Sequence, residues 1–295
     1  MTPTRVILGT ATPGGGFPAY GAAFLDTVHE FEPTLALEAR NTKGSTENVP
    51  LLERGEIDLG LVQGEVAYEA LTGVGRAPAE LRIVAAMYST PGMFVVRADS
   101  AVRTIQDLVG KPVAFGARGS GLVILSRYVL DGLGLDQDRD FQAIYLERAG
   151  DGPEMVLDGR AAALWGGGIG WPGFVKVASS AHGARFIAPS ADEAKTIQSK
   201  HGFLKPLNAP PGSYPGQSAT IDSVGSWSFV MAAPGLAPDI GYRIARALDR
   251  GQASIATRLA QAAETTPANT VAAAPRVELI DAGVAKYLRE IGVLS

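Results

Sequence analysis

Three glycine-rich turns follow apolar, strand-like runs in this sequence, and each could hold a small ligand. The turns span Gly9–Pro18, Gly116–Gly121 and Gly166–Gly173. Glycine lets the backbone come close to a ligand, and the N–H groups at the start of a helix attract an anion. In open α/β sheets such turns lie at the carboxyl ends of strands, where ligands bind. We therefore expect the turns to contact a small anion. A tight turn without a ligand is the alternative for any one of them.

Two of these turns also match part of the glycine pattern of a dinucleotide site. The pattern Gly14-x-Gly16-x-x-Ala19 follows a strand, and Glu38 ends the next strand near the spacing of a ribose-binding acid. Gly168-x-Gly170-x-x-Gly173 has the same short pattern. Each contains a proline, Pro18 or Pro172, where a helical amide should face the pyrophosphate. A nicotinamide-dependent oxidoreductase is therefore only a distant alternative.

Other catalytic patterns are missing from the sequence. The chain has no cysteine, which excludes thiolate metal sites, cysteine nucleophiles and disulfides. The histidines His29, His182 and His201 are far apart and fit no metal-ligand spacing. The sequence holds neither a nucleophile elbow nor a phosphate loop of the GxxxxGK[ST] form. We therefore expect no enzymatic activity, no cofactor and no metal.

The composition indicates a soluble protein with more than one folded core. A length of 295 residues is long for one compact domain and sufficient for two. Apolar residues make up 46% of the chain and charged residues 19%, which suits well-filled cores. The net charge of −4, with both signs interspersed, gives no basic stripe, so we expect no nucleic-acid partner. No apolar run is long enough for a membrane span.

Short apolar strands alternate with helices along the chain. The first hundred residues predict strands at 5–10, 34–40, 57–62 and 82–87 and helices at 19–30 and 46–54, with the second helix starting close to Pro50. The pattern repeats after Arg97, with strands at 112–116, 141–146, 161–165 and 185–188 and a helix between Ser120 and Gly132. A strand at 227–232, an amphipathic helix at 238–249 and a last helix over 277–291 follow. Such alternation predicts βαβ units and mainly parallel sheets.

The repetition of the α/β pattern predicts two lobes in one chain. The densest proline and glycine cluster is Asn208–Gln217 (NAPPGSYPGQ), and it is the best candidate for a crossover between them.

A series of short motifs also occurs in a familiar order along nearly the whole chain. The motifs are Gly14–Gly21 (GGGFPAYG), Gly44–Asn48 (GSTEN), Leu51–Gly60 (LLERGEIDLG), Gln63–Tyr68 (QGEVAY), Gly116–Gly121 (GARGSG), Tyr214–Gln217 (YPGQ) and Tyr287–Gly292 (YLREIG). In this order they resemble the TAXI-type solute-binding proteins of TRAP transporters.

That resemblance implies a two-lobe periplasmic-binding-protein fold, in which each lobe is a mainly parallel sheet flanked by helices. Lobe 1 should comprise residues 1–97 and 222–295, and lobe 2 residues 98–221. The two crossings should lie near Val95 to Asp99 and near Gly216 to Ser223. The ligand should sit in the cleft between the lobes, which close on it.

The function implied by the resemblance is that of an extracytoplasmic receptor. It would bind a small organic anion (a carboxylate, dicarboxylate or amino acid) and deliver it to integral-membrane TRAP transporter subunits. We expect a monomer in the periplasm, although no charged segment or cleavage site precedes the first strand, so an export signal would have been removed. The alternative within binding proteins is a receptor for an aromatic or heterocyclic ligand that serves an ABC transporter or a sensor.

The turns and the resemblance together define a set of expected ligand contacts. They are Gly14, Gly15, Gly16, Phe17, Tyr20, Gly44, Ser45, Gln63, Glu65, Tyr88, Arg118, Gly119, Ser120, Gly121 and Trp165. Ser45 and Ser120 can cap helices, bind the ligand, or do both. Glu65 either engages a ligand ammonium or faces solvent. Arg118 either binds a ligand carboxylate, which its planar fork of donors fits, or is an ordinary exposed arginine.

Overall fold

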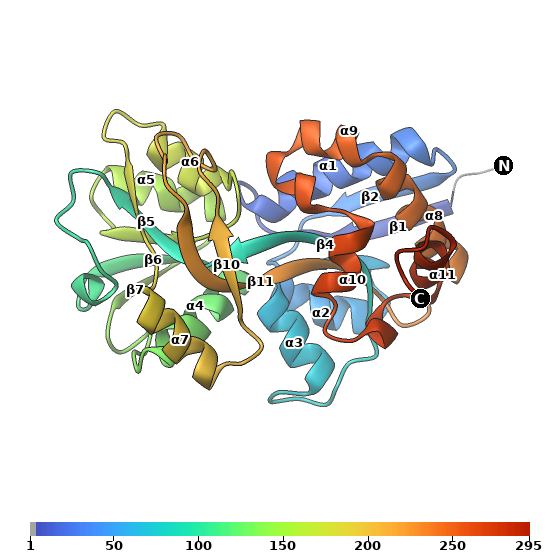
Figure 1. The fold of residues 1–295 in the computed structure, drawn as a ribbon, viewed down its shortest axis with the longest axis horizontal. Coiled ribbons are helices and arrows are strands. Elements are labelled where there is room, and N and C mark those ends of the chain that lie inside the picture. Colours follow the sequence, from blue (N-terminus) through green and yellow to red (C-terminus); the bar gives the residue numbers. More distant parts are fainter. Residues whose placement is uncertain (1–3) are drawn as a thin grey trace. The chain divides into compact units, whose positions relative to one another are not determined.

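Two β-sheets with helices around them form the fold in a computed structural model that describes residues 4–295 (Figure 1). Residues 1–3, in which we looked for an export signal, lie outside the described residues. The chain packs as two compact units. Unit 1 contains the chain up to Ala11, Phe17–Tyr88 and Trp227–Ser295, and unit 2 contains Thr12–Gly16 and Ser89–Ser226.

Unit 1 is built on three parallel strands. They are β1 (Thr4–Gly9), β2 (Leu35–Arg40) and β3 (Leu59–Val62), in the order β2-β1-β3. Residues 229–232 of β11 (Ile221–Ala232) add an antiparallel strand beside β3. The helices are α1 (Gly16–Phe31), α2 (Ser45–Glu53), α3 (Gly64–Thr72), α8 (Pro238–Arg250), α9 (Gln252–Arg258), α10 (Pro267–Ala273) and α11 (Ala282–Glu290). Because helices connect the parallel strands, α2 and α3 both begin at the carboxyl edge of the sheet.

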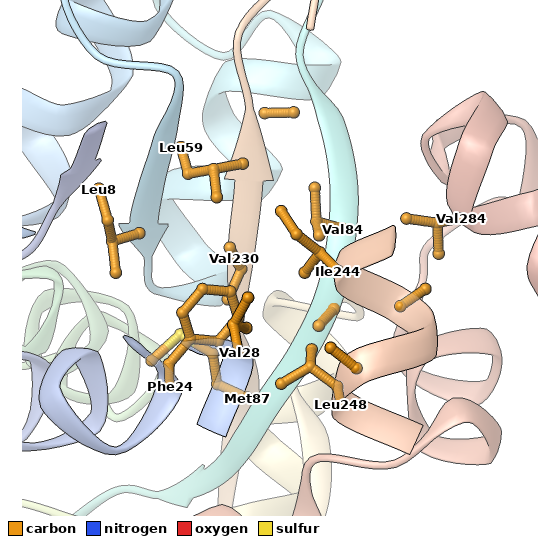
Figure 2. Close-up of a cluster of buried hydrophobic side chains, with 14 of the residues drawn as sticks. Leu8, Phe24, Val28, Leu59, Val84, Met87, Val230, Ile244, Leu248 and Val284 are labelled. Carbon is orange, nitrogen blue, oxygen red and sulfur yellow. The ribbon is translucent and has the colours of Figure 1, made fainter. Parts of the chain in front are cut away.

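The core of unit 1 lies between the strands and the helices α1, α8 and α11. Leu8, Leu59 and Val230 lie on β1, β3 and β11 and are fully buried. Figure 2 shows these side chains packed with others from the strands and helices, namely Phe24, Val28, Val84, Met87, Ile244, Leu248 and Val284. Each such side chain contributes roughly 1.5–3 kcal/mol relative to an exposed position. This cluster therefore fixes how the helices lie on the sheet.

Unit 2 repeats the arrangement with its own sheet. The strand order is β7-β6-β8-β5-β9, with β6 (Pro112–Ala117), β7 (Gln142–Leu146) and β8 (Ala163–Gly166) parallel to one another. The strand β5 (Met93–Arg97) pairs antiparallel with both β8 and β9 (Ala184–Ile187), so β9 again runs parallel to the first three. Its helices are α4 (Gly121–Gly132), α5 (Gly152–Leu157), α6 (Pro172–Ala178) and α7 (Ala191–Lys200). One apolar cluster surrounds Phe115 and Trp165, and another surrounds Phe174. The sheet is thus covered on both faces, as parallel strands require.

Two long strands carry the chain from one unit to the other. β4 (Arg82–Pro91) changes unit after Tyr88 and β11 after Ser226, and the two strands pair. From the sequence, the lobe boundaries were expected after residues 97 and 221, since the α/β pattern repeats after Arg97 and a proline and glycine cluster precedes residue 221. The cluster Asn208–Gln217 lies wholly within unit 2 and begins in the last two residues of β10 (Lys205–Ala209), which pairs with residues 221–225 of β11.

The α/β fold class is confirmed, with corrections to two helices. Helix α2 begins at Ser45 and runs through Pro50 instead of starting beside it. A proline costs a helix one N–H donor, and the buried Leu51 and Leu52 hold α2 on the sheet nevertheless. The predicted last helix over 277–291 is interrupted. Asp281 accepts hydrogen bonds from the N–H groups of Gly283 and Val284, at 2.9 and 3.2 Å, and so starts α11.

Helices α8 and α11 cross closely, which leads to a prediction about stability. A Cβ atom at Gly283 would lie 1.7 Å from the Pro238 carbonyl oxygen. We expect Gly283→Ala to lower the free energy of unfolding by about 1–3 kcal/mol, because the helices must separate. Gly202→Ala is the control, since its Cβ would meet its nearest atom at 3.9 Å. Urea unfolding of both variants measures this, and equal midpoints would contradict the packing.

Candidate functional site

The carboxyl ends of β1 and β3 are tied together by one buried amide. Asn48, in α2, is fully buried, and its Nδ2 donates to the carbonyl oxygens of Gly9, Thr10 and Leu61 at 3.3, 2.8 and 2.8 Å. Gly9 is the last residue of β1, Thr10 directly follows it, and Leu61 lies near the end of β3. The first turn of α2 is therefore fixed against this edge of unit 1.

Helices α2 and α3 begin next to each other at this edge. Gly44 precedes α2 with φ at +112°, which favours glycine, and its N–H donates to Thr42 Oγ1 at 3.1 Å. Ser45 Oγ accepts the N–H of Gln63 at 3.0 Å, so the first residue of α2 bonds to the residue before α3. Two positive helix-dipole ends meet here, and the carboxylates of Glu47 and Glu65 lie in the first turns of the same helices. Of the alternatives left open for Ser45, the structure does not show capping, since the cap position belongs to Gly44 and Ser45 Oγ bonds across to Gln63.

Gln63 and Glu65 are buried at the start of α3. The exposed fractions of their surfaces are 3% and 0%. No residue between 4 and 295 accepts a hydrogen bond from Gln63 Nε2. Buried amides are nearly always paired, so this N–H₂ group is available to a ligand or a water. The alternative in which Glu65 faces solvent is excluded by its burial.

Tyr20 and Tyr88 form an aromatic pair inside unit 1. Their ring centroids are 5.7 Å apart at 65°. The Tyr20 hydroxyl lies 3.0 Å from Thr265 Oγ1, which donates to the Met87 carbonyl at 2.7 Å. Burial raises the pKa of both phenols, so they act as neutral groups. Phe17 is nearly buried in the same core. No sequence motif marked Thr265, because it lies between short helices far along the chain.

In unit 2, the turn after β6 presents a positive charge at the start of α4. The Ser120 hydroxyl accepts from the Leu122 N–H at 3.2 Å, which confirms the predicted cap. Gly119 is buried before it, and Gly121 is the first residue of α4. The Arg118 side chain is exposed, and none of the ion pairs formed among residues 4–295 includes it.

The third glycine-rich turn is filled by its own aromatic side chain. A Cβ atom at Gly166 or Gly173 would lie 2.4 or 2.5 Å from the Trp171 ring, so these glycines serve packing. Trp165 is fully buried, and its indole N–H donates to the Leu122 carbonyl at 2.9 Å. The structure therefore places Trp165 in the core of unit 2, beneath the start of α4.

The first turn packs within unit 2 as well. Thr12 Oγ1 accepts from the Ala149 N–H at 3.4 Å. Gly14 has φ at +81°, and a Cβ atom there would lie 2.7 Å from Gly150 Cα. Gly15 and Gly16 are buried. Backbone meets backbone at Gly14, which accounts for a glycine at that position without a ligand.

Glu38, the residue considered for a dinucleotide site, has a structural partner. Glu38 accepts a hydrogen bond from Arg5 at 2.7 Å, and both side chains are exposed. The described part of the chain contains no cluster of three acidic or histidine side chains that could hold a metal ion. None of its helices combines the length and the apolar character of a membrane span.

The predicted site residues that lie at helix starts form two groups, and four others are core side chains. Gly44, Ser45, Gln63 and Glu65 lie at the starts of α2 and α3 in unit 1. The segment Arg118–Gly121 lies at the start of α4 in unit 2. Phe17, Tyr20, Tyr88 and Trp165 are core side chains in their respective units.

Comparison with known proteins gives one family and several structures. The model of the NMT1-like family matches residues 8–292. The alkanesulfonate-binding protein SsuA from Xanthomonas axonopodis pv. citri, bound to MOPS, is similar at a TM-score of 0.53 and 19% identity, over 100% of this chain and 96% of that one. MatC from Rhodopseudomonas palustris with bound malate is similar at 0.62 and 13%, over 97% and 99%.

A proposed L-cystine ABC transporter from Listeria monocytogenes is similar at a TM-score of 0.55 and 14% identity, over 89% of this chain and 98% of that one. At these identities the likeness to the three structures concerns the fold, which is that of two-lobe periplasmic binding proteins.

The amide of Asn48 provides a prediction for the edge of unit 1. In Asn48→Asp the donor is lost and a carboxyl faces three carbonyl oxygens, so we expect the free energy of unfolding to fall by about 3 kcal/mol or more at neutral pH. Asn41→Asp is the matched control. Asn41 is exposed and its side chain only accepts, from Thr10 Oγ1 at 3.5 Å, so its stability should change by less than about 0.5 kcal/mol. Equal loss in the two variants would contradict the role of Asn48.

Proposed function

This chain belongs to the NMT1-like family, and from that premise we propose that it is an extracytoplasmic solute receptor, not an enzyme, that binds a small organic anion. The fold it shares with SsuA and MatC supports the proposal. Those two structures hold a sulfonate, MOPS, and a dicarboxylate, malate. We extend that ligand class, carboxylates and sulfonates, to this chain.

The observation that carries the proposal is the unpaired charge of Arg118 at the start of α4. A guanidinium offers a planar fork of N–H donors that fits a carboxylate or a sulfonate. The positive end of the α4 dipole lies in the same turn and favours the same charge. A receptor for a neutral or cationic ligand would gain nothing from this arrangement.

Unit 1 would supply the rest of the ligand contacts. Ser45 and Gln63 hold the starts of α2 and α3 together, and Gln63 Nε2 is buried without an acceptor. In our proposal one ligand is bound by both units, which act as the two expected lobes. The ligand then favours the closed state because it gains contacts with both.

The membrane partner in this proposal is an ABC transporter. One structure with the same fold is named as such a system, and the heterocyclic ring of MOPS agrees with the alternative ligand class considered from the sequence. TRAP transporter subunits, implied by motifs such as Gly44–Asn48, are the second candidate. Either partner implies a periplasmic protein, and we propose that it works as a monomer.

A thermal-shift screen followed by calorimetry tests the proposed function. The probes are malate, an alkanesulfonate and MOPS, with glycerol and a diamine as neutral and cationic controls. A ligand present at 100 times its dissociation constant stabilises by about 2.7 kcal/mol. Stabilisation by the diamine or glycerol and by none of the anions would contradict an anion receptor.

Arg118 provides the prediction for the best anion found. We expect Arg118→Ala to weaken its binding by about 2–5 kcal/mol, and Arg118→Lys to recover only part, because it loses the bidentate geometry. Arg160→Ala is the control, since Arg160 is exposed and already paired with Asp158 at 2.6 Å. An Arg118→Ala variant that binds within about threefold of the parent would remove Arg118 from the site.

A further inference from the structure

Arg118 is held by an aromatic ring on the neighbouring strand. Its Cζ atom lies 5.4 Å from the centroid of the Tyr145 ring, in β7. Its backbone N–H donates to the carbonyl of Leu146, the next residue of β7, at 3.3 Å. Backbone and side chain of Arg118 are therefore both fixed against the same strand, although the guanidinium is exposed.

Tyr145 is itself held in place from the other side. Its hydroxyl accepts from Gln137 Nε2 at 2.8 Å and donates to the Asp138 carboxylate. Gln137 is buried, and its Oε1 accepts from the hydroxyl of Ser126 in α4. Burial and the bond to Asp138 raise the pKa of Tyr145, so the ring remains a neutral phenol.

The loop that carries Gln137 and Asp138 is fixed by its own hydrogen bonds. The Asp136 carboxylate accepts from the N–H groups of Asp138 and Arg139, both at 2.9 Å. The Asp136 N–H donates to the Asp140 carboxylate at 2.7 Å. The support behind the Tyr145 ring is therefore a preformed turn and not a single side chain.

An aromatic ring orients a guanidinium in a way that a carboxylate cannot. A carboxylate would neutralise the charge and occupy the N–H donors. The π face attracts the cation and leaves the donors at the edge of the guanidinium available to an anion. Asp138, the acid nearest to the ring, is already engaged by the Tyr145 hydroxyl and lies 3.8 Å from Arg127.

From this arrangement we propose that Tyr145 is the positioning residue of the anion site, holding Arg118 beside the start of α4 with its charge and its donors available. The inference rests on the proposed function, since it assigns Tyr145 a task in binding the same anion. Tyr145 touches the ligand only through Arg118.

The test compares Tyr145→Leu, Tyr145→Phe, Arg118→Ala and the double variant Tyr145→Leu/Arg118→Ala by calorimetry with malate and with MOPS. A cation–π contact at an exposed site is equivalent to about a two- to fivefold change in affinity. We expect that loss in Tyr145→Leu, and affinity close to the parent in Tyr145→Phe, which keeps the ring. The double variant should bind as Arg118→Ala does, because Tyr145 acts only through Arg118.

A ligand-free measurement distinguishes this inference from the proposed function. The NMR resonance of the Arg118 Nε–H group can be assigned by its absence in Arg118→Ala. It should shift in Tyr145→Leu and keep the position it has in the parent in Tyr145→Phe. If this shift occurs while neither malate nor MOPS binds the parent, the proposed ligand class fails and the positioning of Arg118 stands. An unmoved resonance, unchanged affinity in Tyr145→Leu, or additive losses in the double variant would overturn the inference.

Discussion

The hydrogen bonds of one side-chain amide determine the architecture of the functional edge in unit 1. Asn48 donates from α2 to the last carbonyls of β1 and to a carbonyl of β3, and it is fully buried. These hydrogen bonds hold the first turn of α2 against the sheet. Ser45 Oγ then accepts the N–H of Gln63, the residue before α3. Two helix starts are thereby aligned, and each carries a carboxylate in its first turn, Glu47 in α2 and the buried Glu65 in α3.

In the proposed function, the two units contribute to anion binding by different physics. A helix start contributes about 0.3–1 kcal/mol to a nearby charge, and up to about 2 kcal/mol where it is partly buried. Loss of a charged partner from a closed site costs about 2–5 kcal/mol. In the proposed function, α2 and α3 of unit 1 shape the site, whereas Arg118 in unit 2 accounts for the larger part of the affinity. The ring of Tyr145 makes that division possible because it orients Arg118 without neutralising it.

Local patterns in the sequence predicted the strands other than β5 and β10, and the Ser120 cap that starts α4, since each depends on neighbouring residues. They failed where distant contacts decide. Trp171 explains Gly166 and Gly173, and Trp165 proved to be a core residue. Ser45 bonds to Gln63 across 18 residues, and Tyr145 faces Arg118 from another strand. The lobe boundaries were expected where the α/β pattern repeats and beside the proline and glycine cluster. In the structure, β4 and β11 continue as regular strands past the change of unit. Such strands leave no local signal.

Amide hydrogen exchange measured with and without the most stabilising anion tests most directly the claim that one anion is bound by both units. The account predicts slower exchange at saturation in the first turns of α2 and α3 and also in the first turn of α4, with α7 and α9 unchanged. The Arg118→Ala variant at the same degree of saturation should show the same two regions protected. Protection confined to one unit, or spread evenly over the chain, would contradict a ligand held by the helix starts of both.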